Sequence, residues 1–295
     1  MNPPDVSLIL PTRGERPSLV AALQSALAQD FPALEIVVVD DAPAGSRWRQ
    51  DPACASMLAD PRVRVVPFGQ GRGCAAAKNA GLRAAGGRWV CYLDDDNEYR
   101  PDKISAQLAL ANATGCPLVL CGLELRVGVR RRHRQVDRDR FDGDRLLTVA
   151  VADTNVLFHR LQAGLQWDES LGAGDDACFF QAFLEATGER SVPNVPRPLV
   201  IYHAHCGQRA NRNPMSHYRG QRRLLVRWSR GYGRQARRTL LLRSLVARWK
   251  FQTGHWARIV PLACRLVNVG GWREWRLVVN AVGVRLPVVR QWMVT

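Results

Sequence analysis

The sequence lacks paired cysteine motifs, long apolar runs and, from residue 215 onward, almost all acidic side chains. Its eight cysteines are scattered without a CxxC pair, which argues against a disulfide framework or a structural zinc ribbon. No uninterrupted apolar run reaches about 18 residues, so we expect no transmembrane helix. The first residues carry neither the basic nor the apolar part of a secretory signal. These absences predict a cytoplasmic protein whose contact with a membrane is peripheral.

The missing acidic residues give the chain a strongly asymmetric charge. The 295 residues have a formal net charge of +16. Residues 215–295 contain 17 Lys and Arg and one acid, Glu274, so residues 1–214 are neutral overall. The composition, 46% hydrophobic and 23% charged, is that of a globular protein and excludes a disordered, collagen-like or coiled-coil chain. We therefore predict a globular domain over 1–214 and a basic, Trp-rich helical tail over 215–295.

Short apolar runs alternate with helical patterns along the globular part. Such runs are typical of strands that are buried on both faces of a sheet, and their alternation with helices predicts a doubly wound α/β fold. In such a fold, ligands bind outside the carboxyl ends of the strands. The expected strands are 6–10, 36–39, 63–66, 89–93, 118–125, 153–160 (overlapping a segment at 149–158) and 199–202, and the expected helices are 19–27, 74–85, 176–186 and one that begins near Pro101.

Two of the predicted strands end in acidic clusters. Asp94, Asp95 and Asp96 follow one strand, and alternation along an extended chain would bring Asp94 and Asp96 to one point. Two convergent carboxylates suit a hard divalent cation that shares its other positions with water and substrate phosphates. Asp40 and Asp41 end another strand, where a carboxylate can accept hydrogen bonds from a nucleobase or a ribose. Solvated acidic turns are the alternative interpretation of both clusters.

Several of these segments together resemble family 2 glycosyltransferases with the GT-A fold. The resemblance begins with VSLILPT at 6–12, LQSALAQDF at 23–31 and EIVVVDD at 35–41. It continues with GRGCAAAKNAGLRAAGGRWVCYLDDD at 71–96, which ends in an aspartate-rich DxD-type motif. The match is continuous over about 5–110 and thinner to about 210, and it implies a nucleotide-sugar half (about 1–110) and an acceptor half (about 111–214).

The resemblance implies a role for each matched residue on the nucleotide side. Asp96 would be the more direct ligand of Mn²⁺ or Mg²⁺, with Asp94 as its DxD partner and His205, in a later His-bearing loop, as a further metal or phosphate contact. Asn97 stands where many members of the family carry a fourth acid. The residues expected around the nucleotide, normally a uridine diphosphate, are Pro11, Thr12, Asp41, Arg72, Lys78, Asp94 and Asp95.

The resemblance also implies the catalytic and acceptor residues. The segment GAGDDACFF at 172–180 matches the family segment that supplies the catalytic base, which would be Asp176 with Asp175 beside it. Thr154 and Asn155 would lie near the acceptor. Helix capping by the two aspartates is the alternative. A zinc site made of His203, His205 and Cys206 is disfavoured because no other spaced ligands accompany them.

The basic tail contains an amphipathic pattern between 235 and 251, with Leu241, Leu242, Leu245 and Trp249 on one side. Arginine and tryptophan together are typical of a segment that lies on anionic lipid. A helical subdomain with a solvated basic face is the alternative.

Together these features predict a metal-dependent inverting glycosyltransferase that acts at the inner face of the cell membrane. Its donor would be a nucleotide-sugar, most simply a UDP-sugar, and its acceptor a cell-surface glycan or a lipid-linked acceptor. Two other functions remain open: a non-enzymatic protein that binds nucleic acid or a membrane through the tail, and a sugar nucleotidyltransferase. The segment after the first strand fits a nucleotidyltransferase poorly.

Overall fold

The computed structural model describes residues 3–14, 17–44, 46–69, 71–142, 153–171, 174–204 and 214–228, together with Gly233 and Leu241. Two compact units are present. The first contains residues 1–142, 151–170 and 182–207, and the second contains 143–150, 171–181 and 208–295. The predicted amphipathic helix at 235–251 lies outside the described residues, apart from Leu241.

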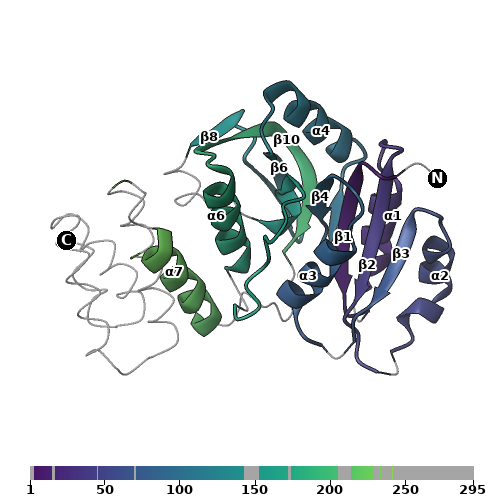
Figure 1. Ribbon diagram of the computed structural model, residues 1–295. Coiled ribbons are helices and arrows are strands. Elements are labelled where there is room, and N and C mark those ends of the chain that lie inside the picture. The colour runs from purple at the N-terminus through teal and green to yellow at the C-terminus, as the bar shows by residue number, and fades with distance from the viewer. Residues whose placement is uncertain are drawn as a thin grey trace, which may run out of the picture. The chain divides into compact units, whose positions relative to one another are not determined.

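The first unit is built on a mixed sheet of ten strands, drawn in Figure 1. Its N-terminal half is parallel and consists of β1 (Val6–Thr12), β2 (Leu34–Asp40), β3 (Val63–Pro67) and β4 (Trp89–Tyr92). The strand order is β3-β2-β1-β4-β9-β6-β10-β5, with β7 paired to β6 and β8 paired to β10. All seven residues of β1 are buried, as the apolar run predicts.

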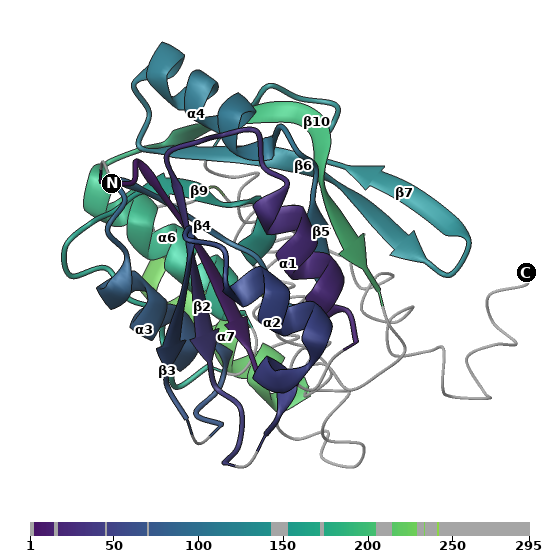
Figure 2. The ribbon, with the colours of Figure 1, turned by 90° about the vertical axis from the view of Figure 1, so that its right-hand side faces the viewer.

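Helices cover both faces of the parallel half. From β1 the chain builds outward to β2 and β3 and then returns to the other side of β1 as β4. Right-handed crossovers therefore require α1 (Leu19–Leu27) and α2 (Pro52–Leu58) on one face and α3 (Cys74–Ala84) on the other. Figure 2 shows this arrangement. Gly81 permits the close approach of α3, because a Cβ there would lie 2.4 Å from Cγ2 of Ile9 on β1.

The second half of the sheet is mixed. It contains β5 (Asn97–Tyr99), β6 (Leu118–Val127), β7 (Arg130–Arg134), β8 (Arg140–Asp142), β9 (Phe158–Arg160) and β10 (Ser191–His203). Strand β9 runs antiparallel to both β4 and β6, and β10 runs parallel to β6. Consequently β1, β4, β6 and β10 all end at the same edge of the sheet. Helix α4 (Lys103–Thr114) packs on β6 and β10.

The doubly wound α/β prediction is confirmed, and the main errors lie in the second half. The strand expected at 153–160 is confirmed only at its end: Thr154–Val156 is a short 3₁₀ turn, and β9 occupies Phe158–Arg160. The helix expected near Pro101 begins at Lys103. Strand β10 is much longer than the predicted 199–202.

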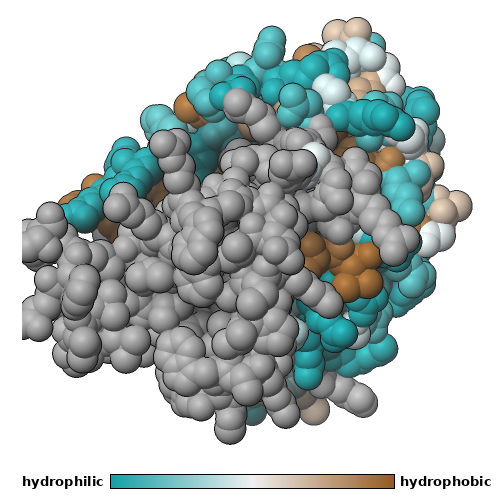
Figure 3. Space-filling view, turned by 90° about the vertical axis from the view of Figure 1, so that its left-hand side faces the viewer, coloured by the Kyte–Doolittle hydropathy of each residue, from teal (hydrophilic) through white to brown (hydrophobic). Residues whose placement is uncertain are grey.

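The second unit contains the start of α6 (Asp175–Thr187) and α7 (Pro214–Trp228). Leu171, Cys178 and Leu224 form a small buried cluster there. Among the described residues, no helix is long and apolar enough to cross a membrane. In the face seen in Figure 3, the described surface is mostly hydrophilic, with hydrophobic residues confined to small patches.

Candidate functional site

The carboxyl ends of β1 and β4 are joined through Asp95. Its Oδ2 accepts a hydrogen bond from Oγ1 of Thr12 (2.8 Å), and its backbone carbonyl accepts one from Oγ of Ser18 (2.9 Å). Thr12 also accepts from the backbone N–H of Gly14 (2.9 Å). Ser18 therefore fixes the start of α1 on the aspartate cluster, and its side chain makes no capping hydrogen bond to the helix. Pro11 is buried beside Thr12 in β1.

Asp94 is held by Asn155. The backbone N–H of Asp94 donates to Oδ1 of Asn155 (2.8 Å), and Nδ2 of Asn155 donates to Oδ2 of Asp94 (3.0 Å). The same Nδ2 also donates to Oδ1 of Asp153 (2.8 Å), so one fully buried amide bridges two carboxylates. Burial and the neighbouring charge of Asp94 raise the pKa of Asp153 to about 6. The sequence offered no signal for Asp153 in this cluster.

Asp96 lies in a turn rather than in an extended strand. Strand β4 ends at Tyr92, and the backbone N–H of Asn97 donates to the carbonyl of Asp94 (3.0 Å). The strand alternation from which we predicted the convergence of Asp94 and Asp96 therefore does not apply. The Asp96 side chain is buried, at 8% exposure.

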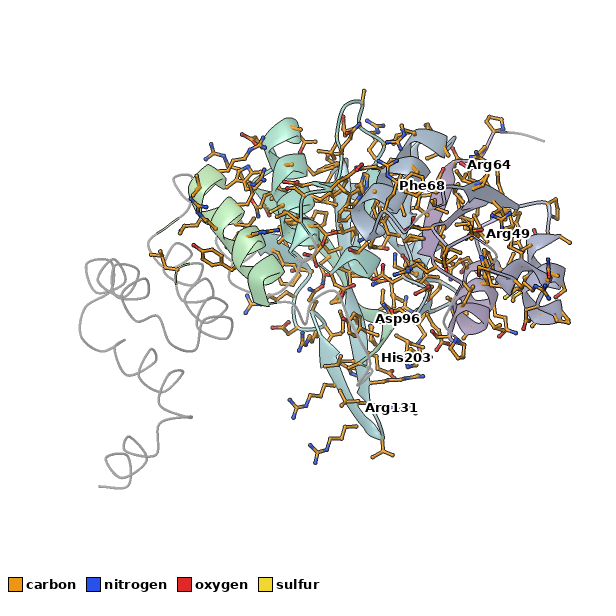
Figure 4. All side chains as sticks on the ribbon, turned by 90° about the horizontal axis from the view of Figure 1, so that it is seen from below. Arg49, Arg64, Phe68, Asp96, Arg131 and His203 are labelled. Carbon is orange, nitrogen blue, oxygen red and sulfur yellow. The ribbon has the colours of Figure 1, made fainter. Side chains whose placement is uncertain are left out.

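The residues after Asp96 connect the cluster to the end of β10. Oδ1 of Asn97 accepts from the backbone N–H of His203 (3.0 Å), and the His203 ring lies 2.6 Å from Oε1 of Glu98. Nδ2 of Asn97 is buried and has no hydrogen-bond partner among the described residues. Figure 4 shows Asp96 and His203 at the same edge of the sheet. His203 is therefore an anchor for this edge. His205 lies outside the described residues.

Asp41 organises the glycine-rich loop at the end of β2. Its Oδ1 accepts from the backbone N–H of Arg72 (2.9 Å) and its Oδ2 from that of Gly73 (3.0 Å), immediately before α3. Gly73 has φ = +99°, a conformation that favours glycine. The Arg72 guanidinium is exposed; it lies 4.9 Å from the ring centre of Phe68 and 3.6 Å from Oε2 of Glu169.

The neighbouring Asp40 has a structural role. It accepts hydrogen bonds from the indole N–H of Trp48 (3.0 Å) and from the guanidinium of Arg49. Its side chain therefore holds the segment after β2 in place, whereas the Asp41 side chain contacts the glycine-rich loop.

Lys78 and Asn79 on α3 bind segments that are distant in sequence. Nζ of Lys78 is buried, donates to Oγ1 of Thr154 (2.9 Å) and lies 4.2 Å from the ring centre of Trp167. Asn79 exchanges two hydrogen bonds with the backbone of Trp167 (2.7 and 3.0 Å) and donates to Glu169 (2.9 Å). The sequence marked Asn79 as part of a motif without assigning it a task; the structure shows that it fastens the 167–169 segment to α3.

Asp175 and Asp176 form the first turn of α6, as predicted. Gly174, with φ = +79°, precedes them, and Oδ1 of Asp176 accepts from the backbone N–H of Ala177 (2.7 Å). Negative side chains in the first turn of a helix are favourably placed relative to the helix dipole.

The donor set of the aspartate cluster fits a divalent metal that its substrate helps to coordinate. Asp94 and Asp96 supply hard oxygen ligands, and only one oxygen of Asp94 is bonded to Asn155. Among the described residues, no group of three or more His, Cys, Asp or Glu side chains forms a metal cage. Magnesium-type ions require no such cage, because they bind one or two carboxylates and complete their coordination with phosphates and water.

The sequence of the chain has recognisable relatives among bacterial polysaccharide proteins. It is 31% identical over 226 residues to the succinoglycan biosynthesis protein ExoO of Rhizobium meliloti, which covers 69% of this chain and 63% of ExoO. It is 29% identical over 103 residues to the UDP-Glc:alpha-D-GlcNAc-diphosphoundecaprenol beta-1,3-glucosyltransferase WfaP of Escherichia coli, covering 35% of this chain and 39% of WfaP. The chain thus spans less than two thirds of either relative.

A solved structure and a family description agree with these relatives. The crystal structure of S. aureus TarS 1–349 in complex with UDP-GlcNAc superposes with a TM-score of 0.66 at 16% identity, over 90% of this chain and 79% of the other. This likeness shows that the fold is GT-A. Residues 7–185, which are more than half of the chain, match the sequence model of glycosyl transferase family 2. The chain belongs to glycosyl transferase family 2.

Proposed function

We propose that the protein is a metal-dependent, inverting glycosyltransferase that transfers a sugar from a nucleotide-diphosphate donor to a hydroxyl group. One observation carries this proposal. In a family 2 chain, the aspartate cluster 94–96 lies at the carboxyl ends of β1 and β4, where the order of the parallel strands reverses. This switch point is the position at which open α/β sheets bind their ligands.

Residues of this edge would bind the nucleotide. Pro11 and Thr12 would line the base and ribose, and Asp41, whose oxygens each retain acceptor capacity beyond one backbone bond, would accept from the base. Arg72 is exposed beside the same loop and can approach the diphosphate. Lys78 would contribute to nucleotide binding through its hydrogen bond to Thr154. Asp95 would contribute by accepting the hydrogen bond that positions Thr12.

Asp96 and Asp94 would hold the Mn²⁺ or Mg²⁺, and His205 would add a metal or phosphate contact. Bound there, the ion would neutralise the negative charge that develops on the departing diphosphate. Asn155 positions Asp94 through its paired hydrogen bonds, so this carboxylate is oriented before any ligand arrives.

Asp176 would be the catalytic base. Inversion requires the acceptor hydroxyl to lose its proton as it attacks the anomeric carbon from the face opposite the nucleotide, and a carboxylate can take that proton. Asp175 would stand beside the base, and Thr154 and Asn155 would lie on the acceptor side of the site.

The acceptor would be a cell-surface glycan or a lipid-linked glycan. Its support comes from two relatives, which are named as a succinoglycan biosynthesis protein and as a glucosyltransferase acting on a diphosphoundecaprenol-linked sugar. A lipid-linked acceptor would keep the enzyme at the inner face of the membrane, and the basic 215–295 segment would contribute to that contact.

A thermal-shift experiment with UDP, GDP, dTDP and CDP, each with and without Mn²⁺, tests the proposal. A ligand that binds only the folded state increases the free energy of unfolding, by about 2.7 kcal/mol when its concentration is a hundred times Kd. The melting temperature rises accordingly. We expect a metal-dependent shift with one nucleotide, and UDP is the first choice. Asp96→Asn should abolish the metal dependence, whereas Asp30→Asn, at an exposed aspartate before β2, should retain it. Absence of any shift with folded protein would favour a non-enzymatic binding protein.

A further inference from the structure

Strands β6 and β7 form a hairpin at the edge of the sheet where the aspartate cluster lies. Val127 pairs with Arg130, and the two-residue connection contains Gly128 at φ = +55°. Since β6 runs in the same direction as β1 and β4, the hairpin extends beyond their carboxyl ends. Figure 2 shows it reaching away from the rest of the sheet, and Figure 4 places Arg131 on the part that projects beyond Asp96 and His203.

One face of the hairpin is organised around the buried carboxylate of Glu124. Arg126 and Arg100 bind it at 2.6 and 3.0 Å, and Arg131 and His133, on the opposite strand, lie within 4 Å. The hydrogen bond from Arg126 lowers the pKa of Glu124, which therefore stays charged. This face is partly neutralised and fixes the hairpin to the body of the sheet.

The other face carries positive charge that pairs with no acidic side chain in the part of the chain that the structure describes. Residues directly opposite in an antiparallel pair share a face, so Arg130, Arg132 and Arg134 stand beside Val127, Leu125 and Leu123 respectively. All three arginines are exposed, and none forms an ion pair with another described residue.

The tip of the hairpin is apolar and exposed. Val129 is 98% exposed and Val127 45%, and these are two of only three large hydrophobic residues that are exposed in the described part of the chain. An ordinary solvated basic face would not need exposed valines, so the projecting apolar tip beside a row of arginines without an ion pair among the described residues points to a more specific role.

We propose that the β6–β7 hairpin docks on an anionic lipid bilayer. The three arginines would contact headgroup phosphates, and Val127 and Val129 would enter the boundary between headgroups and acyl chains. The exposed valines favour lipid over a free polyanion, because a polyanion offers them no apolar environment. Neither residues 215–295 nor a second copy of this chain suits the basic face of the hairpin, because each carries a net charge of +16 and would be repelled by the arginines.

This docking would orient the aspartate cluster. Because the hairpin projects from the same edge, lipid contact would turn the carboxyl ends of β1 and β4 toward the bilayer. If the proposed transfer to a lipid-linked acceptor is correct, the hairpin presents the site to that acceptor. The docking itself does not depend on the transfer activity, so each proposal can fail alone.

Vesicle co-sedimentation of the full chain tests the proposal. The vesicles contain phosphatidylglycerol and phosphatidylcholine in equal parts, or phosphatidylcholine alone. The hairpin variant replaces three arginines together, Arg130→Gln, Arg132→Gln and Arg134→Gln. The control removes the same charge from exposed positions near the opposite edge of the sheet, Arg83→Gln, Arg160→Gln and Arg190→Gln.

Each arginine near such a surface contributes roughly a fivefold change in binding. We therefore expect the hairpin variant to lose at least about tenfold in partitioning onto anionic vesicles at low salt, and the control to lose about threefold at most. Equal losses in the two variants, or no loss in the hairpin variant, would overturn the proposal. A nucleotide thermal shift equal to that of the wild type shows that a variant is folded and separates this test from the test of the transfer function.

Two further measurements distinguish lipid from a soluble polyanion. Val129→Ser should weaken vesicle binding about threefold or more while leaving binding to inorganic polyphosphate unchanged. A benzophenone amino acid in place of Val129 should cross-link to lipid, whereas the same group in place of Arg83 should not. The hairpin does not bind the bilayer if the benzophenone protein still binds vesicles but forms no cross-link at position 129. The same conclusion follows if the arginine variant loses binding to polyphosphate but keeps its binding to vesicles.

Discussion

The cluster around Asn155 allows a quantitative prediction about Asp153. This partly buried carboxylate shares one amide, Nδ2 of Asn155, with Asp94. Burial and the charge of Asp94 raise its pKa from an ordinary value near 3.9 to about 6. A carboxyl group with a raised pKa binds its proton more tightly in the folded protein. Its contribution to stability is therefore complete below about pH 4 and is lost as the pH rises through about 6.

The substitution Asp153→Asn should prevent the decrease in stability that the wild type shows as the pH rises through about 6. The amide oxygen of an asparagine can still accept both hydrogen bonds from Asn155, and the variant carries no charge at any pH. A shift of about two pKa units corresponds to roughly 3 kcal/mol, and solvent near this partly exposed side chain reduces that figure. We expect the variant to be more stable than the wild type by about 1–3 kcal/mol at pH 8 and equal to it near pH 4.

Melting temperatures measured at intervals between pH 4 and pH 8.5 provide the assay. In a chain of this size, 1 kcal/mol corresponds to about 2–4 °C, so the two curves should separate by about 2–10 °C at the alkaline end. Asp30→Asn is the control, because Asp30 is exposed. Parallel curves for Asp153→Asn and the wild type would refute the assignment of a raised pKa, and a variant less stable at every pH would refute the claim that an amide replaces the carboxylate.

Three further predictions concern the remaining clusters. Asp176→Asn should reduce sugar transfer to background while nucleotide affinity, measured by calorimetry, is retained; active Asp176→Asn would exclude it as the base. Asp96→Ala should remove the Mn²⁺ dependence of nucleotide binding, and equal affinity with and without metal in the wild type would contradict the metal role. Asn79→Ala should lower stability by about 2–4 kcal/mol in urea unfolding, because the backbone of Trp167 loses its buried partners; an unchanged midpoint would show that the Asn79 contacts contribute little.

The parallel half of the fold was readable from sequence because its determinants are local. Each strand is a short apolar run, and each acidic cluster directly follows such a run, so the positions of Asp41 and Asp94 at one edge follow from topology alone. The helical spacing of Leu19, Leu23 and Leu27 likewise predicted α1 at its observed bounds.

The mixed half was harder because its strands do not have strand-like compositions. Strand β10 contains Pro193, Pro196 and Pro198, which normally interrupt a sheet, and the register shifts between Val195 and Val200 accommodate the last two. Strand β7 consists of four arginines and one histidine, so its sequence indicated a basic run rather than a strand. Only its pairing with β6 shows that these charges form two faces.

The partner of each acidic side chain was also beyond sequence reasoning. Asn155 lies 61 residues from Asp94, and no local pattern connects the two. The same holds for Thr12 and Asp95, which are 83 residues apart. Long-range hydrogen bonds of this kind depend on the completed topology, so a single sequence identifies the acidic cluster without identifying what orients it.

These partners divide the acidic residues of the edge into two groups. Asp40 and Asp95 bind side chains that hold neighbouring segments, Trp48 and Arg49 for the first and Thr12 for the second, so removal of either would disturb the loops around the site. Among the described residues, by contrast, the Asp94 carboxylate receives only the amide of Asn155, on one oxygen, and an amide donor leaves the negative charge of the carboxylate uncompensated. Uncompensated charge on a preoriented carboxylate is what a divalent cation requires. This difference supports the proposed assignment of Asp94, rather than Asp95, as the partner of Asp96 at the metal, although the three residues are chemically identical in the sequence.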